Sequence, residues 1–149
     1  MKALAPHYEI VIYTASLQLY ADPLMNRIDP EQLCSARLYR EHCTRLDECY
    51  VKDLSKLGRN LKDCIIVENS PYSYRLDQRN AVPIVTWYDD ESDTELYKLI
   101  PFLEELAYVY DVRTVLSLCV DINDPNVADD SIDVEKGRQL IAEMQRKEM

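Results

Sequence analysis

The chain has 149 residues, 47% of them hydrophobic, and a formal net charge of −10. This length and composition predict a single domain with a buried core rather than a disordered polymer. The acidic balance argues against direct binding to nucleic acid or to anionic membranes. With only 2 glycines, the chain also lacks both glycine-rich nucleotide-binding motifs, G-x-x-x-x-G-K-[ST] and G-x-G-x-x-G.

The cysteines and the lack of long apolar runs predict the cellular compartment. The 5 cysteines are odd in number and form no C-x-x-C pair, which indicates a reduced intracellular protein without a structural zinc site. His42, Cys43 and Cys49 lie near one another in the sequence, but their spacing is not typical of a metal site. No transmembrane-length run or signal-peptide pattern is present. We therefore expect a nuclear or cytoplasmic protein that is not secreted and has no membrane segment.

The first part of the chain has the pattern of a strand followed by a helix. Residues 10–13 form a β-branched and aromatic run, which predicts a strand covered on both faces of a parallel sheet. Apolar residues then recur at helical spacing over 17–28. Either Ser16 caps this helix, or Asp22 caps a helix that opens with Pro23.

The middle of the chain predicts two more buried strands. Asp53 and Gly58 are typical of the cap and the stop of a short helix. Apolar runs at 63–68 and 82–87 indicate strands, and the proline that begins 71–75 predicts a short helix between them. The alternation of buried strands and amphipathic helices predicts an α/β fold with a mostly parallel sheet.

The last third is predicted to be helical. Ser92 and Glu95 have the spacing of a capping box in front of a long amphipathic helix, which Pro101 should kink. Asp93 either caps this helix itself or shares the cap with Ser92. A second capped helix is expected over 111–118. The acidic stretch after it has no apolar period and predicts a linker, followed by a polar C-terminal helix that is either an appendage or a partner-binding element.

Polar side chains follow the predicted strands. Thr14 comes after the first strand, and Glu68 and Asn69 end the strand at 63–68, while Lys52 lies between the two. A hydroxyl at a helix start can hold a phosphate, a lysine can stabilise a phosphoryl transition state, and a carboxylate beside an amide oxygen can hold Mg²⁺. Each residue taken alone is more often a helix cap or a surface side chain.

The chain also contains the residue spacing of a second class of phosphatases, but not the loop that their chemistry needs. Cys34 and Arg40 have the C-x5-R spacing of cysteine-dependent phosphatases. That chemistry needs a loop whose amides turn inward on the phosphate, normally with glycine. The segment from Cys34 to Arg40 contains no glycine and alternates as a strand does, so we expect no such site.

Several longer segments resemble a known family. These segments are YEIVIYTASLQLYADPLMNRID, REHC, YVKDLSKLGRNLKDCIIVENSP, NAVPIVTWYDDESDTELYKLIPFLEEL and DVRTVL. From about Tyr8 to Leu118 they resemble, in order and spacing, the small phosphatases acting on the RNA polymerase II C-terminal repeat and their Dullard-type, NLI-interacting-factor-like relatives in the haloacid dehalogenase superfamily. The resemblance implies a three-layer, haloacid-dehalogenase-like α/β domain over 1–119, incomplete at its amino end, with 120–149 as acidic linker and C-terminal helix.

The resemblance also implies a reaction. The family is expected to hydrolyse phosphoserine and phosphothreonine in proteins with Mg²⁺, through an aspartyl-phosphate formed on the first Asp of a D-x-D-x-[TV] motif. Residues of this chain that match family positions are Lys52 and Thr14 (catalytic), Arg40, Leu17 and Tyr20 (substrate-binding), and Asn69 with Glu68 (metal). The implied partner is a phosphorylated protein substrate or a protein partner, not a nucleic acid.

Two departures from the family pattern bear on activity. No D-x-D-x-[TV] occurs in the chain, and Glu68 stands where the family has Asp. The extra methylene displaces a carboxylate in a site that needs near-octahedral geometry. A fragment, a gene model started at an internal methionine and a true pseudophosphatase remain open, and each predicts an inactive chain. The alternative function is non-catalytic binding of a phosphopeptide or protein, as in the translocase receptor of the mitochondrial inner membrane, which resembles this family.

Overall fold

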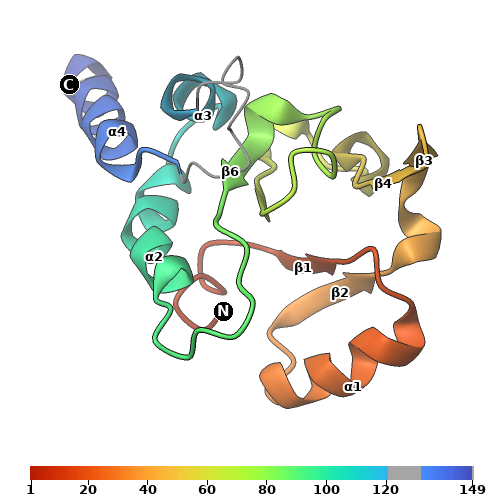
Figure 1. The fold of residues 1–149 in the computed structure, drawn as a ribbon. Helices are drawn as coiled ribbons and strands as arrows, with labels where there is room; N and C mark the ends of the chain where they lie inside the picture. The colour runs from red at the N-terminus through yellow and green to blue at the C-terminus, as the bar shows by residue number, and fades with distance from the viewer. Residues whose placement is uncertain (121–131, 149) are drawn as a thin grey trace.

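The computed structural model describes residues 1–120 and 132–148 (Figure 1). In this part of the chain, β1 and α1 come first, strands and short 3₁₀ helices follow, and the other α-helices lie in the last third. The strands are β1 (Ile10–Tyr13), β2 (Cys34–Leu38), β3 (Thr44–Leu46), β4 (Cys49–Val51), β5 (Ile66–Glu68) and β6 (Ala81–Pro83). The α-helices are α1 (Gln18–Ile28), α2 (Glu95–Leu106), α3 (Arg113–Cys119) and α4 (Val134–Glu148), and the 3₁₀ helices are η1 (Arg40–His42), η2 (Leu54–Leu57), η3 (Leu61–Asp63) and η4 (Gln78–Asn80).

The strands of the described residues form three separate two-stranded sheets. β1 pairs with β2 and β5 pairs with β6, both in parallel, whereas β3 and β4 form an antiparallel hairpin. The predicted α/β class with parallel strands is therefore confirmed. A continuous sheet joining the two parallel pairs is not formed within 1–120 and 132–148, so each pair keeps a free edge.

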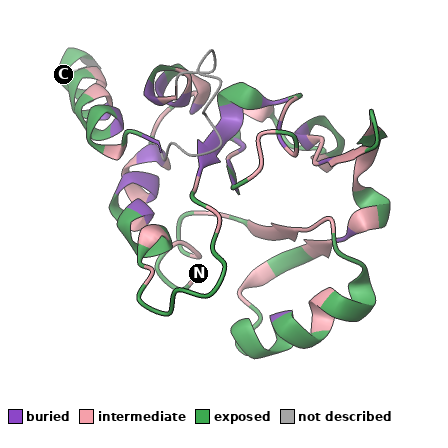
Figure 2. Cartoon of the chain, viewed as in Figure 1, coloured by how far each residue is buried: buried purple, intermediate pink, exposed green. Residues whose placement is uncertain are grey.

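The main core lies among the helices of the second half. It contains fully buried Phe102 and Leu106 of α2, Val115 and Leu116 of α3, and Val82 of β6. A second, smaller cluster packs η2 and β5 together with Tyr74. Figure 2 shows that buried residues gather around α2, α3 and β6, whereas α1 is largely exposed. All four residues of β1 are only partly buried, although the sequence predicted a strand covered on both faces.

The predicted start of α1 is wrong, and of the two residues predicted to cap α2 only Asp93 bonds the helix end. α1 begins after Leu17, which makes no side-chain cap, and Pro23 lies inside the helix. At α2 the predicted capping box is absent, because Asp93 Oδ1 instead accepts a hydrogen bond from the main-chain N–H of Glu95. Short polar side chains compete for the same amide groups, so spacing alone does not decide which one caps a helix.

Two other predicted elements differ in extent. Residues 71–76 form turns rather than a short helix, and the strand expected over 82–87 is β6, which ends at Pro83. Pro83 has no main-chain N–H to continue a ladder. Asp53 and Gly58 bracket η2 as predicted, with Asp53 Oδ1 accepting from Ser55 N and Gly58 in the left-handed region at φ 67°. The predicted linker falls mostly in 121–131, outside the described residues.

The C-terminal helix α4 packs against the core instead of standing free as an appendage. Its Ile141 is buried in the main cluster, and Gly137 lies directly over Phe102, so that a Cβ built there would be 2.5 Å from Cε2 of the ring. Glycine is required here by close approach of the helices, since its φ is ordinary.

Substitution Gly137→Ala is expected to lower the free energy of unfolding by about 1–3 kcal/mol, because the added methyl overpacks against the Phe102 ring. In an exposed helix the same change stabilises by about 0.5–1 kcal/mol, so the sign of the effect reports the packing. Urea unfolding followed by circular dichroism measures it. Gln139→Ala, on an exposed position of the same helix, is the control and should change stability little; stabilisation by Gly137→Ala would show that α4 does not pack on α2.

Candidate functional site

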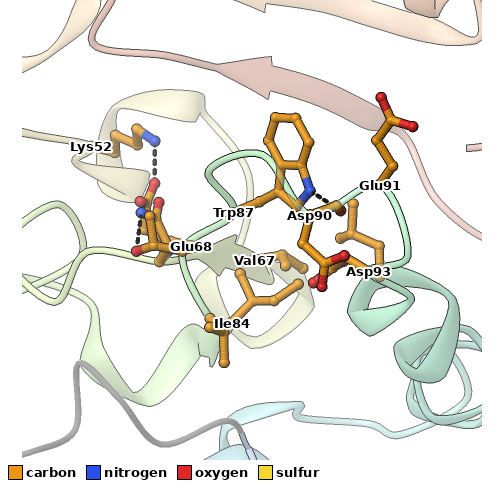
Figure 3. A pocket seen from close by; sticks show the side chains of 12 residues that line it. Lys52, Val67, Glu68, Ile84, Trp87, Asp90, Glu91 and Asp93 are labelled. Carbon is orange, nitrogen blue, oxygen red and sulfur yellow. Dashed lines mark hydrogen bonds and ion pairs between the residues drawn. The ribbon is translucent and has the colours of Figure 1, made fainter.

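A buried ion pair joins the ends of two strands. Lys52 follows β4, and Glu68 is the last residue of β5. The Lys52 Nζ contacts Glu68 Oε2, and only 12% and 6% of the two side chains are exposed (Figure 3). The main-chain N–H of Lys52 donates to the Ser73 carbonyl at 2.7 Å, which fixes the lysine beside the turn that follows β5.

The second oxygen of the Glu68 carboxylate is also occupied. Glu68 Oε1 accepts hydrogen bonds from the main-chain N–H groups of Asn69 and Ser70, both at 3.0 Å. A carboxylate that accepts two amides and an ammonium is held by charge-assisted hydrogen bonds. Glu68 therefore closes the turn after β5 and neutralises Lys52 at the same time.

Asn69 points toward the chain that leaves β6. Its side-chain Nδ2 donates to Thr86 Oγ1 at 2.9 Å, so the amide oxygen Oδ1 faces away from that contact. Lys52, Glu68 and Asn69 line one pocket of about 680 Å³ together with residues from 84–96. The structure thus brings three of the predicted site residues to one cavity at the carboxyl ends of β5 and β6.

The other predicted residues lie in a neighbouring cluster at the end of β1. The main-chain N–H of Thr14 donates to the Leu38 carbonyl at 2.9 Å, and Thr14 Oγ1 accepts from Ser16 N at 3.1 Å. Arg40 Nε donates to the Ala15 carbonyl at 2.7 Å, and its guanidinium lies 5.0 Å from the centre of the Tyr50 ring. Thr14 and Arg40 are not among the residues that line the pocket.

Two substrate-binding candidates sit at the start of α1. Leu17, the residue before the helix, is 43% exposed, and Tyr20 in its first turn is 71% exposed. Arg40 reaches this segment, since its main-chain N–H donates to the Ser16 carbonyl at 3.0 Å. Leu17 and Tyr20 therefore present exposed apolar side chains on the segment that follows the Arg40 contact with Ser16.

Cys43, which the sequence analysis considered only beside His42 and Cys49, lies next to Thr14. Its Sγ lies 3.9 Å from the Thr14 carbonyl oxygen. Burial raises the pKa of the Cys43 thiol, and the charges of Lys52 and Arg40 counteract that rise. The thiol is therefore neutral and lies within electrostatic range of both clusters. No sequence motif indicated that Cys43 would lie beside Thr14.

Comparison with known proteins identifies the family. The model of the NLI interacting factor-like phosphatase family matches residues 1–113. The chain belongs to this family. It is 51% identical over 118 residues to an uncharacterized protein of Schizosaccharomyces pombe, covering 79% of this chain and 36% of that protein. It is 50% identical over 116 residues to a probable C-terminal domain small phosphatase of Dictyostelium discoideum, covering 78% and 38%.

A human relative has a similar match. The chain is 47% identical over 116 residues to carboxy-terminal domain RNA polymerase II polypeptide A small phosphatase 2 of Homo sapiens, covering 78% of this chain and 43% of the relative. The chain thus spans between 36% and 43% of the length of these three proteins. The family resemblance inferred from the sequence is confirmed, and it is a family of protein phosphatases. No helix among the described residues is long and apolar enough to cross a bilayer.

The ligand set for magnesium, the cofactor expected for the NLI interacting factor-like phosphatases, is incomplete in the described residues. No group of three His, Cys, Asp or Glu side chains that could hold a metal occurs within 1–120 and 132–148. Both Glu68 oxygens already accept hydrogen bonds, from Lys52 and from main-chain amides, and Asn69 offers only its Oδ1. Mg²⁺ requires near-octahedral oxygen coordination, usually with one or two carboxylates, so the residues as arranged do not fit the ion.

Cys34 does not form a second phosphatase site. It opens strand β2, while Arg40 begins η1 beyond the end of that strand. Burial, together with the nearby Asp29 carboxylate, raises the pKa of Cys34 to about 11. Because the thiolate is the nucleophile, this shift disfavours Cys34 as a nucleophile at neutral pH.

Proposed function

We propose that the chain is part of a Mg²⁺-dependent protein serine/threonine phosphatase whose substrates are phosphoproteins such as the RNA polymerase II C-terminal repeat. We also propose that this chain of 149 residues has no turnover of its own. Membership of a protein phosphatase family supports the substrate class. The absence of D-x-D-x-[TV] from the sequence supports the lack of turnover, because aspartyl-phosphate chemistry needs an attacking carboxylate.

The single structural observation that supports the lack of turnover is the set of partners of the Glu68 carboxylate. It is the carboxylate at the strand end beside Lys52 and Asn69, and both of its oxygens are engaged. A metal ion or a phosphorus atom would therefore have to compete with these partners for the Glu68 carboxylate. Lys52 is already paired with Glu68, so a phosphoryl group that Lys52 stabilised would compete with that carboxylate for the ammonium.

The second candidate function, phosphopeptide binding without turnover, is favoured by Arg40. Only Nε of its guanidinium hydrogen-bonds to another described residue, so the two terminal nitrogens can form the bidentate contact that arginine makes with phosphate. The exposed Leu17 and Tyr20 lie on the adjoining segment and offer apolar contact to residues flanking a phosphoserine.

One experiment separates these functions. We expect the purified chain to release no more phosphate from 4-nitrophenyl phosphate or from a phosphoserine-proline peptide, with Mg²⁺, than Lys52→Ala does. In fluorescence anisotropy the phosphopeptide should bind about tenfold more tightly than its unphosphorylated form, since charge-assisted hydrogen bonds contribute about 1.5–3 kcal/mol. Arg40→Met should abolish this difference.

Arg146→Met on α4 removes the same charge far from the site and is the matched control. Phosphate release above background that Lys52→Ala removes would contradict the lack of turnover. Equal binding of the two peptides would instead indicate a protein scaffold that is indifferent to the phosphate.

A further inference from the structure

The main chain of Arg40 is held in place by hydrogen bonds. Its N–H donates to the Ser16 carbonyl at 3.0 Å, and its own carbonyl accepts from the Cys43 N–H at 3.0 Å. The short helix η1, which begins with Arg40, is also tied to β1, since the Tyr13 hydroxyl donates to the His42 carbonyl at 2.7 Å. The Arg40 side chain therefore starts from a fixed point between β1 and α1.

The Arg40 side chain is held as well, by two different contacts. Its Nε donates to the Ala15 carbonyl at 2.7 Å. Its Cζ lies over the face of the Tyr50 ring, 5.0 Å from the ring centre. The negative face of an aromatic ring attracts a guanidinium, and arginine often stacks on such rings. The first contact fixes the Nε edge of the group and the second restricts its rotation, so the two terminal nitrogens point in a defined direction.

Tyr50 is supported independently of Arg40. It is the middle residue of β4, which forms a hairpin with β3. The next residue, Val51, is fully buried. The residue after that, Lys52, donates its main-chain N–H to the Ser73 carbonyl at 2.7 Å. Because the ring belongs to an element with its own anchors, it can orient the guanidinium instead of following the movements of that group.

These contacts restrict how a phosphate can bind to Arg40. A guanidinium offers a phosphate two parallel N–H groups, either on Nε and one terminal nitrogen or on both terminal nitrogens. Nε already donates to the Ala15 carbonyl, and the Tyr50 ring lies on one side of the group. The pair formed by Nη1 and Nη2 is therefore the one that remains. An orientation that is fixed before binding lowers the entropic cost of the contact.

We propose that Tyr50 is a positioning residue, which holds the Arg40 guanidinium for end-on binding of a phosphoserine or phosphothreonine phosphate through Nη1 and Nη2. This inference rests on the proposed phosphopeptide binding and adds to it a residue that acts through Arg40. Loss of the ring should therefore weaken binding of a phosphorylated peptide and leave binding of its unphosphorylated form unchanged. Phenylalanine should replace tyrosine, because the contact is made by the ring face.

Fluorescence anisotropy with the full chain and the phosphoserine-proline peptide tests these expectations. Tyr50→Leu should weaken phosphopeptide binding about two- to fivefold, which corresponds to a cation–π contact of about 0.5–1 kcal/mol. Tyr50→Phe should keep the full affinity. Tyr110→Leu is the matched control, since it removes the ring beneath a different cation, Lys62 Nζ at 3.8 Å from the ring centre. It should change the affinity for neither peptide.

A second measurement needs no peptide. Hydrogen exchange of the Arg40 Nε–H, followed by nitrogen-15 NMR, should be about two- to fivefold faster in Tyr50→Leu than in the unsubstituted chain or in Tyr50→Phe. An unchanged exchange rate in Tyr50→Leu would overturn the positioning role. So would an equal loss of affinity for both peptides, or an equal loss of phosphopeptide affinity in Tyr50→Leu and Tyr50→Phe.

Failure of the proposed phosphopeptide binding gives a different result. In that case the unsubstituted chain binds the two peptides equally, and the exchange rates of the Arg40 Nε–H alone decide whether Tyr50 orients the guanidinium.

Discussion

Replacing Glu68 with methionine is expected to lower the free energy of unfolding by about 3–5 kcal/mol, since removing one partner of a buried ion pair leaves an uncompensated charge. The change strips Lys52 of its counter-ion and leaves the main-chain amides of Asn69 and Ser70 without their acceptor. Urea unfolding at neutral pH, followed by circular dichroism, gives the value.

The partner substitution completes a double-mutant cycle. Lys52→Met should cost less, about 1.5–3 kcal/mol, because Glu68 keeps its two main-chain donors. The double variant should be more stable than the sum of the single changes predicts, by at least about 1 kcal/mol. If the two effects simply add, Lys52 and Glu68 are not coupled, and the ion pair does not organise the site.

Replacing Asn80 with aspartate is the second change with a large expected effect, about 3–5 kcal/mol at pH 7. Asn80 is 2% exposed, and its Nδ2 donates to the carbonyls of Leu61 at 2.6 Å and Cys64 at 2.8 Å. These hydrogen bonds hold η3 and the residues just before β5 against the start of β6. A carboxylate at this position would face two carbonyl oxygens and could donate to neither.

The loss should depend on pH. Burial beside two acceptors raises the pKa of the new carboxyl above the unfolded value of about 3.9. Below pH 4 the new carboxyl is protonated and the folded variant accommodates it. The free energy of unfolding of the variant then falls as the pH rises through the folded-state pKa. Urea unfolding at pH 4 and pH 7, each relative to the unsubstituted chain, measures the difference.

Asn60→Asp is the matched control for Asn80. The Asn60 side chain acts as an acceptor, from the Lys62 N–H at 3.2 Å, and aspartate caps a helix equally well. We expect little change at either pH. A loss for Asn80→Asp no greater than for Asn60→Asp would show that the two carbonyl contacts do not hold this part of the site.

The local elements were predictable where one strong pattern dominated. The apolar runs around Ile10–Tyr13 and Ile66–Glu68 are strands, and Asp53 and Gly58 bracket their short helix. Predictions failed where several local signals competed. At α2, Ser92 has the spacing of a cap, but Asp90 accepts its main-chain N–H and Asp93 takes over the helix end.

The composition of the site was predictable in part. Lys52, Glu68 and Asn69 were selected from the sequence, and all three line one pocket. Their roles stay predictions, and Thr14 belongs to the adjacent cluster. The ion pair between Lys52 and Glu68 had no sequence signal, because the two residues are 16 positions apart and belong to no common motif.

The sequence by itself determined the family, the alternation of strands and helices, and the positions of the polar residues at strand ends. Those features depend on residues that are close together in the sequence, so they can be inferred from the sequence alone. Only the tertiary structure decided that Glu68 neutralises Lys52, that the parallel strands form two pairs with free edges, and that α4 packs over Phe102. These features depend on contacts between segments that are far apart in the sequence. Burial and close packing decide those contacts, and the periodicity of one segment does not specify which other segment it will contact.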